Sequence, residues 1–527
     1  MKKILFPLSI LIVLILFFTF TSCNSQDEIL SENLDFELSE NGLAYSVSGI
    51  KETKADHIII PETHNGLPVT SINNNAFRDN DTIKRIDIPQ SIISIGEAAF
   101  YNCSALELII IPDSVITLGR QVFKGCSSLA IALIGDFVTD IPYQAFAECP
   151  SLQIVHIGAS VSHIGDSAFY LCTSLSDIKN IASNEKLTKI DNYAFYRCSS
   201  LVSISIPQTV TSIGESAFAY CSSLRSVSIP NGITSIENET FAHCSSLFNI
   251  EFVKKQDEKY NLTTIGNSAF DSCESLSSIV IPDTVTSIGE SAFENCTSID
   301  NVIIPSSVRV LGDRAFLNCF SLSSIEINGL IKSIGYRAFE NCRSIKKISK
   351  LPTSITAIRD KAFAGCTSLE SIDLPNALTE IGNDAFKNCT SLSQINITYS
   401  VKSIGDNAFA YCTSLTDITF SDSSKLKTIG NSAFYLCTSI KELKLPKSLT
   451  VIGSYAFSDC YDLESLTIPK SVHTVKEGAV YNCYLLTVYC ENDSKPYTWN
   501  SSWNPSSRPV VWGYATEATT LEEINPE

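Results

Sequence analysis

The sequence predicts a repeat solenoid of the leucine-rich-repeat type, built from short strands and short helical turns and capped at both ends. Three observations predict it. The motif Ala-Phe-x-x-Cys recurs along the chain, in most copies at steps of 23 residues. Seventeen of the 19 cysteines take the same position in this motif or its variants. Each clean copy also has the L-x-x-L-x-L spacing of a leucine-rich repeat. Counting Phe77 as a degenerate first copy and Val480 as a late one, we expect 18 coils across 71–483.

The chain begins with a segment typical of protein export. Lys2 and Lys3 precede an apolar stretch over 4–20, and two small residues lead into Cys23. This pattern resembles a bacterial lipoprotein signal, in which the chain is cleaved before the cysteine and the sulfur is acylated. We therefore expect residues 1–22 to be a signal peptide and Cys23 to carry lipid. An uncleaved N-terminal membrane anchor is the alternative, because about 20 apolar residues span a bilayer.

Residues 23–70 are expected to form a linker and the N-terminal cap. A solenoid needs a cap because its first coil would otherwise expose an apolar face. The run Ile-Ile-Ile-Pro at 58–61, followed by Gly-Leu-Pro-Val at 66–69, already has the pattern of half a repeat. The cap is therefore expected to merge into the first coil.

The copy at 198–218 shows what one coil must contain. Ile204 and Ile206 lie on one side of an extended segment, with serines on the other side. Pro207 cannot donate a backbone hydrogen bond, so the strand ends there. A second short apolar segment follows, and Gly214 permits the corner after it. The Ala-Phe pair is then predicted to lie on a short helical turn. Such a unit buries its apolar side only against identical neighbours, so the core becomes a continuous column.

The phenylalanine and cysteine positions are predicted to form ladders inside the solenoid. We interpret the cysteines as small buried side chains with free thiols. A disulfide framework is the alternative, because an exported protein meets an oxidising environment. Side chains at identical positions point in parallel rather than toward each other, and Asn80 occupies the same slot, which favours free thiols. Cys483 with Cys490 is the one pair for which a disulfide is a specific alternative.

Four copies are longer than 23 residues, and in the three longest the extra segment follows the first strand of its coil. The insertions are therefore expected to emerge along one rim, where insertions in repeat proteins often mark the binding side. Neutral drift in loop length is an equal alternative. The longest insertion carries Lys254, Lys255 and Lys259, which form a candidate binding rim.

The residue between the two apolar positions of the first strand is expected to face solvent. Most residues at this position are small or polar, which suits an extended polymer or a protein partner. Ile110, Leu133 and His156 fall on three consecutive coils, and Val280 and Ile303 fall on two. These five residues are the candidate binding face. The alternative is that they are scattered exposed apolar side chains, which are normal on protein surfaces.

Residues 484–527 contain all three tryptophans, Trp499, Trp503 and Trp512. We interpret this segment as a C-terminal cap that buries large rings over the last coil and ends in an acidic tail. Exposed aromatic rings that stack on a carbohydrate are the alternative.

Charge and motifs argue against several classes of function. The net charge of -18 disfavours nucleic-acid binding. The sequence has no H-E-x-x-H, G-x-S-x-G, G-x-G-x-x-G or P-loop motif, so no catalytic residue, metal ligand or cofactor is predicted. His156 and His163 share one copy, but the turn between the two strands should separate their directions. A solenoid without a further domain also offers little room for a deep pocket.

The consensus C-x-S-L-x-x-I-x-I-P-x-x-V-x-x-I-G-x-x-A-F resembles the BspA-like leucine-rich repeats of bacterial surface proteins, and the resemblance covers residues from about 58 to 483. It implies a non-enzymatic, adhesin-like surface protein that binds host matrix proteins, glycans or other cells. With the expected lipid anchor, it implies a monomeric, exported protein on the outer-membrane surface. The alternatives are a structural surface protein without a specific ligand and an accessory glycan-binding lipoprotein. A repeat encodes a scaffold, and the scaffold alone does not identify the ligand.

Overall fold

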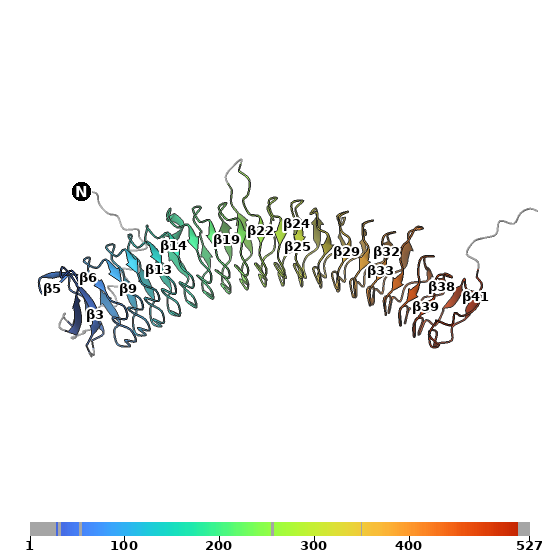
Figure 1. Ribbon diagram of the computed structural model, residues 1–527, viewed down its shortest axis with the longest axis horizontal. Helices are drawn as coiled ribbons and strands as arrows, with labels where there is room; N and C mark the ends of the chain where they lie inside the picture. Colours follow the sequence, from blue (N-terminus) through green and yellow to red (C-terminus); the bar gives the residue numbers. More distant parts are fainter. Residues whose placement is uncertain (1–27, 30–32, 52–54, 255–257, 349, 515–527) are drawn as a thin grey trace, which may run out of the picture.

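The computed structural model is a β-solenoid of about 20 turns of ~23 residues, and it forms an arch in Figure 1. The predicted fold class is thus confirmed. The structure describes residues 28–29, 33–51, 55–254, 258–348 and 350–514. The expected signal peptide, Cys23, Lys255 and the acidic tail beyond 514 lie outside these residues. The solenoid has more turns than the 18 copies counted in the sequence, because strands of both end segments add further turns to it.

Each coil places its first strand in a parallel ladder along one side of the solenoid, here called the first-strand face. Equivalent residues of successive coils pair directly, as Ile131 does with Leu108 and Ile154. The ladder is interrupted at several points and so consists of separate sheets. Its strands are β1 (Glu28–Ile29), β4 (His57–Ile59), β7 (Arg85–Asp87), β9 (Leu108–Ile110), β11 (Ile131–Leu133), β13 (Ile154–His156), β15 (Asp177–Lys179), β17 (Ser203–Ile204), β19 (Ser226–Ile229), β21 (Asn249–Phe252), β24 (Asn301–Ile304), β26 (Ser324–Ile327), β28 (Lys347–Ile348), β30 (Ser371–Ile372), β32 (Gln394–Ile397), β34 (Asp417–Phe420), β36 (Glu442–Lys444), β38 (Ser465–Ile468), β40 (Thr487–Cys490) and β41 (Val510–Trp512).

A second strand in each coil builds a second parallel ladder, here called the second-strand face. At its N-terminal end, β2 (Leu34–Leu38) pairs antiparallel with β3, and β5 (Thr63–His64) pairs antiparallel with β6. The strands of this ladder are β3 (Tyr45–Ile50), β6 (Leu67–Ile72), β8 (Ser94–Ile95), β10 (Thr117–Leu118), β12 (Asp140–Ile141), β14 (His163–Ile164), β16 (Lys189–Ile190), β18 (Ser212–Ile213), β20 (Ser235–Ile236), β22 (Thr264–Ile265), β23 (Ser287–Ile288), β25 (Val310–Leu311), β27 (Ser333–Ile334), β29 (Ala357–Ile358), β31 (Glu380–Ile381), β33 (Ser403–Ile404), β35 (Thr428–Ile429), β37 (Val451–Ile452) and β39 (Thr474–Val475).

The segment with the Ala-Phe pair is not helical, which corrects the prediction of short helical turns. Among the described residues, 3-10 structure occurs at Asn33 and in η2 (Ile181–Ser183), and there is no α-helix. The Ala-Phe segment is instead a run of tight turns with two left-handed residues per coil, such as Ala98 at φ 53° and Asn102 at φ 58°. This path lets alternate N–H groups bond to the next coil, as Phe100 N–H does to the Val122 carbonyl at 2.8 Å. A helix would satisfy those groups internally and leave adjacent coils unlinked along this side.

The phenylalanine ladder is confirmed. Seventeen buried rings, from Phe77 to Phe457, stack nearly parallel with neighbouring ring centroids 5.0–5.6 Å apart. The column runs through the length of the core. It makes the interior of each coil depend on the coil before and after it.

The cysteine ladder lies beside this column, and all 18 described cysteines, including Cys483 and Cys490, are buried with free thiols. Each of the 17 repeat cysteines donates its S–H to the phenylalanine carbonyl of the preceding coil, with S to O distances of 3.0–3.3 Å. The position therefore needs a small apolar side chain that can also donate a weak hydrogen bond, and cysteine meets both needs.

The glycine at the corner serves a purpose other than the predicted one. Gly214 is not among the residues with positive φ, so the corner does not need glycine's backbone freedom. A Cβ atom at Gly214 would lie 2.4 Å from the backbone nitrogen of Asn192 in the preceding coil. The absence of a side chain allows neighbouring coils to approach closely at this corner.

The tryptophans close the C-terminal end of the core. Trp499 and Trp503 are 3% and 5% exposed, and their rings meet edge to face at 5.1 Å. Trp512 on β41 packs against Trp499 at 5.9 Å. The Trp499 indole N–H donates to the Val472 carbonyl at 3.1 Å. These rings lie in a packed end of the solenoid rather than on a free stacking surface.

Candidate binding surfaces

The first-strand face brings three predicted residues together. Ile110 on β9 lies beside Leu133 on β11, which lies beside His156 on β13. Ile110 is 46% exposed, and Leu133 and His156 are half-buried. The exact 23-residue step between these coils carries the residues into register, so the sheet makes one surface of them.

Three apolar residues that the sequence reasoning missed complete this surface. Leu108, Ile131 and Ile154 lie two positions earlier on the same strands, and alternate residues of a strand point to the same face. Leu108 is only 8% exposed, whereas Ile131 and Ile154 are half-buried. The sequence indicates that these three residues are unusual, since the same strand position is serine, asparagine or charged in most other coils. We call the six residues the apolar patch: Leu108, Ile110, Ile131, Leu133, Ile154 and His156.

Charged and polar groups border the apolar patch on both sides. On β7, the Arg85 Nε pairs with an Asp87 carboxylate oxygen at 2.9 Å, and His57 contacts the other oxygen at 3.0 Å. On β15, Lys179 forms an ion pair with Asp177. The charged groups on both sides of the apolar patch thus form ion pairs with each other. The patch is the apolar centre of a surface with a polar border.

His156 is held in place at the border by the neighbouring insertion. The Asn180 side-chain amide donates to His156 Nε2 at 2.8 Å. His163 of the same coil lies on the second-strand face, where its Nε2 is 2.6 Å from an Asp191 carboxylate oxygen. The two histidines are therefore separated, as predicted.

Val280 and Ile303 form a second, separate apolar pair on the first-strand face. The pairing of Ser278 with Asn301 places Val280 beside Ile303, and these side chains are 77% and 49% exposed. Glu326 follows Ile303 on the next strand, β26. The strands β15, β17, β19 and β21 come between this pair and the apolar patch, so the five predicted residues form two surfaces rather than one.

The insertion that carries Lys254 and Lys259 follows β21, and its described part projects from the outer edge of the arch in Figure 1. Lys254 and Lys259 are exposed, and the Lys254 ammonium lies 4.8 Å from the Tyr260 ring centroid. The Asn231 amide donates to the Lys259 carbonyl at 3.1 Å and ties the base of the insertion to the preceding coil.

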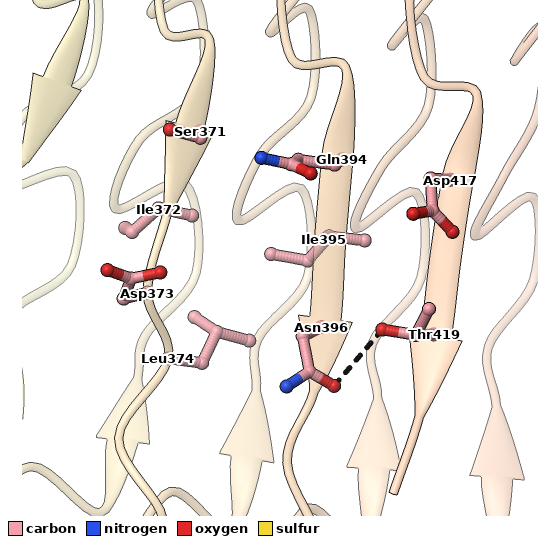
Figure 2. Close-up of a pocket in the computed structure, with 9 residues that line it drawn as sticks. All are labelled: Ser371, Ile372, Asp373, Leu374, Gln394, Ile395, Asn396, Asp417 and Thr419. Carbon is pink, nitrogen blue, oxygen red and sulfur yellow. Dashed lines mark hydrogen bonds between the residues drawn. The ribbon is translucent and has the colours of Figure 1, made fainter.

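A polar hollow of about 220 Å³ lies on the first-strand face where the sheet is interrupted between β30 and β32. Figure 2 shows Asn396 turned toward Thr419, whose hydroxyl donates to the amide oxygen at 3.2 Å. The hollow is shallow and can offer hydrogen bonds but no apolar floor large enough to hold a ligand alone. Its lining residues are Ser371, Ile372, Asp373, Leu374, Gln394, Ile395, Asn396, Asp417 and Thr419.

The electrostatics of the described residues give no sign of a reactive centre. Burial raises the pKa of the Cys244 thiol to about 12, and other ladder thiols are raised in the same direction for the same reason. Burial also acts to raise the pKa of Asp191, but hydrogen bonds from Lys189 and His163 outweigh it and lower that pKa overall. Within the described part of the chain, no three His, Cys, Asp or Glu side chains are grouped so as to hold a metal ion.

Over the described ranges, the structure contains no helix that is both long and apolar enough to span a bilayer.

Several solved structures are similar to this chain. A leucine-rich repeat protein from Bacteroides ovatus is 23% identical, with a TM-score of 0.43, and the match covers 92% of this chain and 100% of that one. A leucine-rich cell surface protein from Faecalibacterium prausnitzii is 24% identical, with a TM-score of 0.29, and the match covers 91% and 97% of the two chains. The pneumococcal vaccine antigen PcpA is 16% identical, with a TM-score of 0.24, over 94% and 100%. No curated protein matches the sequence.

The repeat itself gives the family. The model of the BspA type leucine-rich repeat region, which spans six copies, matches residues 50–176, 174–261, 263–393 and 356–487. These matches cover most of the chain and coincide with the coils of the solenoid. The chain therefore belongs to the BspA type leucine-rich repeat family.

Proposed function

We propose that this protein is a non-enzymatic, adhesin-like binding protein that holds a protein partner on its first-strand face. The observation that carries this proposal is the apolar patch on β9, β11 and β13, which is contiguous and bordered by paired charges. Protein interfaces have this anatomy, with an apolar centre inside a polar rim. An aliphatic surface without an exposed aromatic ring suits apolar protein side chains better than a sugar, which prefers an aromatic ring to stack against.

The proposed location is the cell surface, with the chain held by lipid on Cys23. The support is the sequence pattern over 1–23 and the membership of a repeat family that resembles bacterial surface proteins. Mass spectrometry of the N-terminal peptide from cells that express the full chain tests the anchor. A diacylated or triacylated Cys23 is expected, and Cys23→Ala should release the protein from membranes. An unmodified, uncleaved N-terminus would refute the anchor.

The binding proposal is tested with residues 23–527 as a soluble protein against immobilised host matrix proteins and glycan arrays. We expect saturable binding to a protein, and we expect the double variant Ile110→Asp, Leu133→Asp to weaken it about tenfold or more, because charge would enter the apolar centre. The double variant Val280→Asp, Ile303→Asp is the matched control on the separate pair and should bind normally. Binding of no ligand would support the structural alternative, and binding of glycans alone would support the accessory glycan-binding alternative.

A further inference from the structure

The second-strand face carries a row of residues that is basic in the C-terminal half of the solenoid. Each residue directly precedes a second strand, and backbone bonds join successive members, such as Lys427 N–H to the Lys402 carbonyl at 2.8 Å. The sheet from β27 to β39 is uninterrupted, so the row is continuous. It contains no carboxylate, and its members are Lys332, Thr356, Thr379, Lys402, Lys427, Thr450 and His473.

A lysine cluster forms where this row meets the insertion after β34. Lys402 and Lys427 are exposed neighbours on adjacent coils, and exposed Lys425 comes from the insertion. The Lys425 ammonium lies 5.4 Å from the ring centroid of Tyr399, which is 39% exposed. None of these three lysines has an ion-pair partner among the described residues. We define Tyr399, Lys402, Lys425 and Lys427 as the lysine cluster.

The charge of this surface is opposite to that of the molecule. The chain as a whole carries a net charge of -18, yet three unpaired ammonium groups are gathered here. Glu380 on β31 and Asp422 in the insertion are exposed carboxylates in the same part of the chain. Unpaired lysines that outnumber nearby carboxylates attract a ligand with repeated negative charges.

The spacing and chemistry of the row favour a polyanionic glycan. Adjacent coils lie about 4.8 Å apart, so Lys332 is about 14 Å from Lys402 along the row. Between them, Thr356 and Thr379 supply oxygens that can accept hydrogen bonds from sugar hydroxyls. The Tyr399 ring offers an apolar face for a pyranose ring.

We propose that the lysine cluster and the row that extends it to Lys332 bind a sulfated glycan. The ammonium groups would pair with sulfate or uronate groups, and Tyr399 would contact a sugar ring. This site lies on another face and in another half of the solenoid from the apolar patch, so it is independent of the proposed protein-binding function.

The test measures binding of a heparin oligosaccharide to residues 23–527 by calorimetry at low and at physiological salt. The triple variant Lys402→Gln, Lys425→Gln, Lys427→Gln is expected to bind about tenfold more weakly or worse, with a shallower salt dependence. The matched control is Lys346→Gln, Lys347→Gln, Lys350→Gln, which removes the same charge from exposed positions on the first-strand face. Tyr399→Ala should weaken binding without changing the salt dependence. Circular dichroism verifies that each variant folds.

Three outcomes would overturn the proposal. They are no binding of heparin, an equal loss in both triple variants, and equal affinity for desulfated heparin or single-stranded DNA. The Ile110→Asp, Leu133→Asp variant should bind heparin normally, so failure of the glycan site and failure of the apolar patch can be told apart.

Discussion

Each repeat cysteine donates a hydrogen bond to the buried phenylalanine carbonyl of the preceding coil. The carbonyl of Phe316 accepts the N–H of Cys319 within its own coil at 3.3 Å and the S–H of Cys342 from the next coil at 3.2 Å. Both bonds are buried, where an unpaired acceptor would be costly. Sequence counting identified the cysteines as packing residues, but it could not show the donor role, because that role depends on the distance between coils.

Because the repeat thiols are buried, we predict that the free energy of unfolding falls at alkaline pH. Burial raises the pKa of Cys366 and Cys412 to about 12, whereas an unfolded thiol titrates near 8.5. Below about pH 8.5 both states are protonated, and the contribution is fully present. Above it the unfolded chain loses protons first, so stability falls with rising pH until the folded pKa is passed, by up to about 1.4 kcal/mol per thiol per pH unit.

Urea denaturation at pH 8 and pH 10 in reducing buffer measures this effect. The double variant Cys366→Ala, Cys412→Ala should show a smaller loss between the two pH values than the unmodified protein, because two titrating groups are gone. Tyrosines and lysines titrate in the same range in both proteins, so the comparison cancels them. An identical loss in both proteins, or rapid reaction of native thiols with a thiol reagent at pH 8, would contradict the burial argument.

At the scale of the element, the sequence predicted the strands and their inward faces well, because apolar alternation reports burial directly. It predicted helical turns wrongly around the Ala-Phe pair. Ala98 is a good helix former, yet it takes a left-handed conformation because bonds between coils outweigh local preference. The apolar patch is larger than the predicted set of positions. Ile110 follows from the middle position of the first strand, whereas Leu108 occupies a position two residues earlier that is polar in most coils.

The close approach of coils at the glycine corner gives a prediction for one element. A Cβ atom at Gly312 would lie 2.4 Å from the backbone nitrogen of Glu290 and the carbonyl carbon of Gly289. Gly312→Ala should therefore push β25 away from β23 and destabilise the protein by about 1–3 kcal/mol, the usual range for overpacking. Gly49→Ala is the control, because its Cβ would meet nothing nearer than 3.6 Å.

Thermal and urea unfolding of the two variants give the measurement. Gly312→Ala should unfold at a lower midpoint, and Gly49→Ala should differ little from the unmodified protein. Equal midpoints for the unmodified protein and Gly312→Ala would show that the corner can widen freely, and that close approach does not explain the glycine.

At the scale of the whole molecule, the solenoid has no single core that must form at once. Each coil touches the coil before and after it, and stability is nearly a sum of coil and neighbour contributions. The sequence could predict this architecture because each 23-residue repeat corresponds to one coil of the solenoid. It could not predict where the first-strand ladder breaks, as between β30 and β32, since small changes in the path of the chain decide which backbone groups pair.

This architecture predicts that one coil can be deleted if the phase of the repeat is kept. Removal of residues 294–316 joins Phe293 to Leu317, the residue that follows Phe316, and so takes out one 23-residue unit. The shortened chain should fold with its phenylalanine and cysteine columns intact, and the solenoid should shorten by about 4.8 Å. Removal of residues 294–304 instead deletes the first strand β24 and places the residues that precede β25 directly after Phe293, so the repeat loses its phase and the neighbouring coils should be disrupted. Circular dichroism, urea unfolding and small-angle X-ray scattering compare the two chains.

Because the apolar patch and the lysine cluster lie on opposite sides of the deletion, the in-phase chain should keep both binding activities. If the in-phase chain fails to fold, the coils are not interchangeable units.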